Sequence, residues 1–120
     1  MKLAILIFSL FITGLITLTD SGANISGTWV MEADKVLYSP PVMHIEMGEG
    51  IWQGTIDIPE QEVYDKEIHS IRVKQDSIFI TVYKDGPVIN ATLVNDNAIV
   101  GIMPVEGRVD TVRFNKIINQ

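Results

Sequence analysis

Residues 77–94 read SIFITVYKDGPVINATLV, two runs in which apolar and polar side chains alternate on either side of a turn. Alternation with a period of two places every second side chain on one face of a β-strand. The Lys-Asp-Gly-Pro sequence between the runs is typical of a turn, because glycine tolerates positive φ and proline presets φ. The stretch therefore predicts an antiparallel hairpin that carries Ile78 and Ile80 on one apolar face with Ile89 and Ala91.

The same alternation continues on both sides of this hairpin. We expect eight strands, at residues 26–32, 42–47, 51–58, 68–74, 77–83, 88–94, 98–103 and 109–116. Beyond residue 23, no stretch sustains the i, i+3, i+4 apolar spacing of a helix. Eight short antiparallel strands with one apolar face each favour an all-β, up-and-down barrel, because closure leaves no exposed edge strand. A β-sandwich is the alternative, since alternation alone does not separate the two architectures.

The N-terminus carries the features of an export signal. Lys2 precedes a mostly apolar run at residues 3–18, and Ser21-Gly22-Ala23 places small residues at the −3 and −1 positions of a cleavage site. As a helix the run would span ~24 Å, less than the ~30 Å hydrocarbon core, so cleavage is favoured over retention as an anchor. We expect residues 1–23 to be a signal peptide. Residues 24–120 would form one exported domain, periplasmic or secreted, without membrane insertion of the mature chain.

The composition argues against several kinds of function. Its 15 acidic and 9 basic residues give a net charge of −6, and the basic residues do not cluster, which argues against nucleic-acid binding. The chain has no cysteine, so it has neither disulfides nor thiolate metal ligands. No serine lies in a Gly-x-Ser-x-Gly elbow, and no glycine-rich phosphate loop is present. We therefore expect neither a cofactor nor catalytic activity.

Clusters of metal-ligating and acidic residues are few. His44-Ile45-Glu46 offers two metal ligands on one strand face, with His69 as a distant third. That face is the polar, outward one, and a metal site needs converging ligands, so no metal site is predicted. The acidic stretch at residues 59–66 is expected to be an exposed, solvated loop rather than a catalytic carboxylate pair.

Candidate contact residues come from a loop and a strand. Tyr38, Pro40 and Pro41 present an aromatic ring and two prolines at a strand entrance, and are candidates for ligand or partner contact. His69 shares its parity with the apolar Ile71, which predicts a position at the barrel rim and a further contact there.

Two motifs resemble a known family. Gly27-Thr28-Trp29 is similar to the Gly-x-Trp that opens lipocalin-type barrels. Residues 52–61, WQGTIDIPEQ, resemble the W-x-A-x-L-D-S-P-x-Q stretch of a lipocalin-like accessory domain. That domain precedes the α/β-hydrolase module, serine peptidase or esterase-like, of certain secreted bacterial enzymes. No hydrolase module accompanies it here, so the resemblance implies a hydrolase-associated domain that stands alone.

The resemblance also implies how the barrel closes. Gly27 and Trp29 would lie at the bottom, with a basic side chain of the last strand over the tryptophan ring. Arg113 and Lys116 are the two candidates, and Arg113 is the better one because its planar guanidinium can stack as well as attract. Parity complicates this assignment, since Arg113 alternates with the inward-facing Phe114.

Three functions follow from these features. The resemblance implies a non-catalytic binding module that acts through protein contacts, which is the function we expect. A lipocalin-like carrier of a small apolar ligand is the alternative, and an enzyme is the weakest of the three. Interior volume separates the first two: a continuous apolar cavity of ~300 Å³ or more favours the carrier, and a filled barrel with an exposed apolar patch favours a protein partner.

Overall fold

The computed structural model describes residues 22–32 and 39–118, and a single antiparallel sheet of nine strands dominates them. The strands are β1 (Gly27–Glu32), β2 (Val42–Gly48), β3 (Ile51–Ile58), β4 (Val63–Glu67), β5 (Ser70–Lys74), β6 (Ser77–Thr81), β7 (Val88–Asn95), β8 (Ala98–Val105) and β9 (Arg108–Lys116). One short 3-10 turn, η1 (Pro59–Gln61), separates β3 from β4. Within the described residues, no helix has the length and apolar character needed to cross a membrane.

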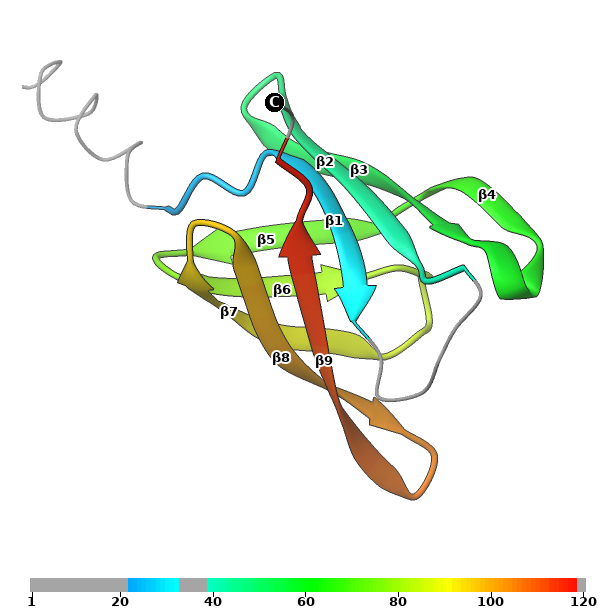
Figure 1. The fold of residues 1–120 in the computed structure, drawn as a ribbon. Helices are drawn as coiled ribbons and strands as arrows, with labels where there is room; N and C mark the ends of the chain where they lie inside the picture. The colour runs from blue at the N-terminus through cyan, green and yellow to red at the C-terminus, as the bar shows by residue number, and fades with distance from the viewer. Residues whose placement is uncertain (1–21, 33–38, 119–120) are drawn as a thin grey trace, which may run out of the picture.

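The sheet curls on itself into a half-barrel (Figure 1). Its strand order is β4-β3-β2-β1-β9-β8-β7-β6-β5, so the first and last strands are neighbours in its middle. The edges are β4 and β5, which do not pair with each other. Where the chain passes between them, the Ile68 N–H donates to the Gly54 carbonyl at 2.9 Å. The all-β, barrel-like fold is confirmed, but the sheet has nine strands rather than eight and its edges remain open.

The ninth strand is β4, which occupies part of the stretch at residues 59–66 that was expected to be a loop. It pairs with β3, with Ile56 opposite Lys66 and Ile58 opposite Val63, and the register shifts between these two pairs. An edge strand with one neighbour needs little apolar alternation, and charged residues on such an edge oppose aggregation. The acidic sequence therefore predicted a loop where a strand lies, because this strand is formed by backbone pairing with β3 and not by side-chain burial.

The inner face of the sheet carries the apolar core. Ile78 and Ile80 on β6 are fully buried, as the alternation of this strand predicts. Trp29 and Phe114 are the largest fully buried side chains, and Trp52 is half-buried and packs against the same core. Side chains therefore fill the interior of the half-barrel around these residues.

Gly54 marks a close approach between β2 and β3. A Cβ at this position would lie 2.5 Å from the carbonyl oxygen of His44. No side chain fits in that space, so the glycine lets the two strands bend against each other, as glycines at barrel bends do.

Candidate functional site

Trp29 closes one end of the half-barrel. Its ring is fully buried, and its indole N–H donates to the Ile25 carbonyl at 3.0 Å. Lys116 lies opposite Trp29 in the β1–β9 register, with its Nζ 5.7 Å from the ring centroid. At this distance the ring quadrupole attracts the ammonium group. The stem of the lysine passes over Gly27, where a Cβ would lie 2.5 Å from Lys116 Cε.

The cation over Trp29 is thus Lys116 and not Arg113, which the sequence had favoured. Arg113 lies opposite Glu32, and its Nε is 3.4 Å from the Glu32 carboxylate. Since Arg113 alternates with the buried Phe114, it projects from the outer face and does not reach the ring. Strand parity therefore decides the pairing in favour of Lys116.

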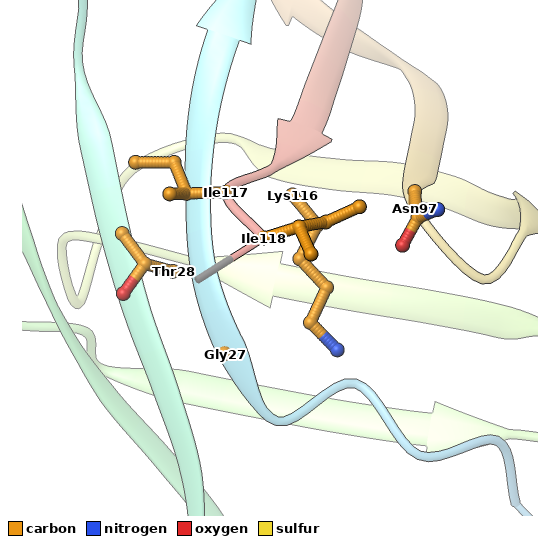
Figure 2. A pocket seen from close by; sticks show the side chains of 6 residues that line it. All are labelled: Gly27, Thr28, Asn97, Lys116, Ile117 and Ile118. Atoms are coloured by element: carbon orange, nitrogen blue, oxygen red, sulfur yellow. The ribbon is translucent and has the colours of Figure 1, made fainter. Parts of the chain in front are cut away.

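A shallow depression surrounds the exposed side of this lysine. Figure 2 shows the Lys116 side chain beside Gly27 on β1, with Asn97 across the depression. The depression measures about 520 Å³ and is lined by Gly27, Thr28, Asn97, Lys116, Ile117 and Ile118. Its cation already lies over Trp29, and its wall mixes polar and apolar groups, so it is a weak candidate for a binding site.

A second pocket, which we call the apolar pocket, is lined by residues from the ends of β1, β3 and β6 and from the start of β7. Its volume is about 280 Å³. That value is slightly below the ~300 Å³ named above as the mark of a carrier, which is also the lower limit of the ~300–1,000 Å³ usual for small-molecule sites. Its walls are almost entirely apolar, and the lining residues are Met31, Pro41, Ile56, Ile58, Gln61, Val82, Tyr83, Pro87, Ile89, Met103 and Phe114.

Alternation explains most of this lining. Ile56, Ile89 and Phe114 are buried residues on the inner faces of their strands. Beyond them the η1 turn and the segment between β6 and β7 form the rim, which supplies Gln61, Val82, Tyr83 and Pro87. The half-barrel is therefore packed around Trp29 and hollow at this rim.

Two polar side chains reach the apolar pocket from its rim. Gln61 of η1 supplies an amide and Tyr83 supplies a phenol. The Lys66 Nζ lies 4.8 Å from the centroid of the Tyr83 ring. None of these three was a candidate from sequence: Gln61 and Lys66 lie in the stretch expected to be a solvated loop, and Tyr83 was placed in the strand at residues 77–83, whereas β6 ends at Thr81. Among the described residues, no charged side chain lines the pocket itself.

Among the described residues predicted to make contacts, His69 and Pro41 lie in different pockets. Pro41 lines the apolar pocket and Pro40 immediately precedes it, whereas Tyr38 lies outside the described residues. His69 is exposed and lines a different groove, beside Trp52. Its expected parity with Ile71 is lost because β5 begins only at Ser70 and the chain turns before it.

His44 lies on the outer face of β2, within a small polar network. Its Nδ1 is 3.1 Å from the Thr28 hydroxyl, and its Nε2 is 3.9 Å from the Asp57 carboxylate. Across the parts of the chain that the structure describes, no three His, Asp or Glu side chains gather as metal ligands. An exposed histidine whose ring nitrogens face a hydroxyl and a carboxylate is well solvated, and this arrangement gives no reason to assign it chemistry.

Comparison with protein-family models, curated proteins and solved structures found no match to this chain. The geometry alone defines its class: an antiparallel half-barrel domain with one closed end and an apolar pocket at the other. The function proposed below therefore rests on the residues of that pocket.

Proposed function

We propose that this protein is an exported, non-catalytic binding module that holds a small apolar ligand in the apolar pocket. The observation that carries the proposal is the lining of the pocket, where nine of the eleven side chains are aliphatic, aromatic hydrocarbon, thioether or proline groups. An apolar concavity with a few polar groups at its rim is the usual form of a small-molecule site.

Burial of apolar surface would drive this binding. Each methylene group that moves from water into the pocket contributes about 0.8 kcal/mol, which corresponds to about a fourfold gain in affinity. For a series of linear alcohols from 1-hexanol to 1-dodecanol, affinity should rise by this factor per carbon and then level off when the pocket is full. Displacement of the neutral fluorophore N-phenyl-1-naphthylamine measures this series.

A pocket-filling variant tests the location. Val82 lines the pocket, and Val82→Trp should abolish binding of the fluorophore while circular dichroism confirms an intact fold. Val94→Trp is the matched control, since Val94 is 52% exposed on β7 and lies outside the pocket. Equal binding by both variants, or no binding by the unmodified protein, would rule out the pocket as the site.

A second function, contact with a protein partner, is favoured by a separate apolar surface. Ile102, Val109 and Val88 are 48%, 60% and 39% exposed. The register of β7, β8 and β9 places them on the outer face of the sheet, opposite to the buried Ala91 and Val112. Exposed apolar side chains on neighbouring strands are a common feature of partner surfaces. By resemblance, that partner would be a hydrolase.

Native mass spectrometry of the protein purified from its own host separates the two functions. A bound small molecule that is lost in Val82→Trp supports the carrier. A bound protein that is lost in Val109→Asp, and retained in Val82→Trp, supports the partner.

A further inference from the structure

Lys66 occupies an unusual place for a charged residue, on the inner face of the sheet. The register of β3 and β4 sets it opposite Ile56, whose buried side chain lines the apolar pocket. Directly opposed residues of an antiparallel pair project from the same face. Lys66 is half-buried and does not line the pocket itself, but it lies beside Tyr83, which does.

The ammonium group of Lys66 lies beside one side chain of the pocket lining. It lies 4.8 Å from the centroid of Tyr83, which follows β6 and lines the pocket. It also donates to the Glu67 carbonyl across a long 3.5 Å contact. Within the described residues, no carboxylate oxygen lies within ion-pair distance of this nitrogen. Its charge is therefore compensated by an aromatic face, one carbonyl and solvent.

The acidic residues near Lys66 are directed elsewhere. Glu67 is the next residue along β4 and therefore projects from the outer face. The Asp57 carboxylate accepts the backbone N–H of Asp65 at 2.8 Å and so belongs to the outer side of the β3–β4 pair. Glu60 in the η1 turn and Glu62 at its C-cap are both exposed. Among the described residues, none of these carboxylates lines the pocket, whereas the Lys66 ammonium group lies beside Tyr83 of its lining.

We propose that the ligand of the apolar pocket is an amphipathic anion, an aliphatic chain that ends in a carboxylate. The carboxylate would meet Lys66 at the rim, with the Gln61 amide as a second donor, and the chain would lie between Ile56 and Ile89. A volume of about 280 Å³ holds roughly nine groups of the size of a water molecule, at ~30 Å³ each. Linear chains of about eight to ten carbons therefore match the space. This inference rests on the proposed function, because it specifies the ligand of the same pocket.

Three probes with one chain length and different head groups test it: decanoate, 1-decanol and decylammonium. Each displaces N-phenyl-1-naphthylamine from the full exported protein. A charge-assisted hydrogen bond to Lys66 should make decanoate bind about tenfold tighter than decylammonium. Lys66→Met keeps the length of the side chain but removes its charge. It should lower the affinity for decanoate about tenfold and the affinity for 1-decanol less than about twofold.

Two variants serve as controls. Lys74→Met removes an exposed lysine of β5 that does not line the pocket, and should change none of the three affinities. Lys66→Arg keeps the charge and should keep the preference for decanoate, and circular dichroism of Lys66→Met checks that this variant is folded.

The outcomes separate the two proposals. Equal or tighter binding of decylammonium overturns the selection of anions, and so does a Lys66→Met variant that loses 1-decanol as much as decanoate. In both cases binding in the pocket still stands. If none of the probes displaces the fluorophore, the proposed function itself is wrong.

Discussion

Lys116 of β9 and Trp29 of β1 form a cross-strand pair in which the ammonium nitrogen lies 5.7 Å from the centre of the indole ring. The pair joins the first strand to the last, two segments that are far apart in the sequence. It also covers the largest side chain of the core, whose N–H is satisfied by the Ile25 carbonyl. The closed end of the half-barrel thus depends on one long side chain lying across another, with room made by Gly27.

Gly27→Ala should lower the free energy of unfolding by about 1–3 kcal/mol, from strain at its φ of 143° and from contact with Lys116. In a Lys116→Ala background the contact is absent, so the same substitution should be less destabilising by about 1 kcal/mol. Urea denaturation of the four proteins in this cycle measures the coupling. Additivity within about 0.5 kcal/mol would show that the lysine does not restrict this position.

The two tryptophans should differ in their contribution to stability. Trp29 is fully buried, so Trp29→Ala should destabilise the domain by about 3–5 kcal/mol. Trp52 is only half-buried beside the core, so Trp52→Ala should be less destabilising, by about 1–3 kcal/mol. The denaturation midpoints of the two variants show which substitution is the more destabilising. A larger loss for Trp52→Ala would mean that the β3 edge, and not the closed end, holds the core together.

Strand positions were predictable wherever one face is buried and the other solvated. The strand at residues 51–58 was predicted with the bounds that β3 has, and the inner positions Ile78 and Ile80 are buried as expected. Alternation reports burial, so it succeeds where burial forms the strand. It fails for β4, where pairing with β3 holds a polar sequence in place.

The candidate site was less predictable for the same reason. Pro41 was singled out from sequence, but the inward position of Lys66 depends on a register that crosses a shift between Ile56 and Ile58. Likewise, His69 was assigned to the inner face on the assumption that the alternation of β5 extends to residue 69. The strand begins only at Ser70, so the alternation does not apply to His69. A pocket at the meeting point of turns depends on long-range register, which local patterns do not encode.

Export should remove residues 1–23, and the mature protein should begin at Asn24. Cleavage there also removes the hydrogen bond from the Ala23 N–H to the Gln75 carbonyl, 2.9 Å long, at the end of β5. The buried Ile25 remains, so the closed end should stay intact. N-terminal sequencing of the exported protein checks the site, and a full-length product retained in the membrane would contradict it.

Asp57 should hold the β4 edge in place. One of its carboxylate oxygens accepts the N–H of Asp65 at 2.8 Å, and Asp65 has a φ of 51°, a conformation that needs such support. Asp57→Ala should therefore cost about 1 kcal/mol and speed amide exchange in β4 about fivefold, with little change in β8 and β9. Hydrogen exchange followed by mass spectrometry measures both regions.

Asp57→Asn is the conservative variant, because its amide oxygen still accepts the Asp65 N–H, and it should keep most of the protection. Glu60→Ala removes an exposed carboxylate of η1 and is the control for charge alone. Because β4 carries Lys66, which lies beside the apolar pocket, Asp57→Ala should also lower the affinity for decanoate more than the affinity for 1-decanol. Unchanged exchange in Asp57→Ala would show that pairing with β3 is sufficient to hold β4. The placement of Lys66 would then rest on the β3–β4 register alone.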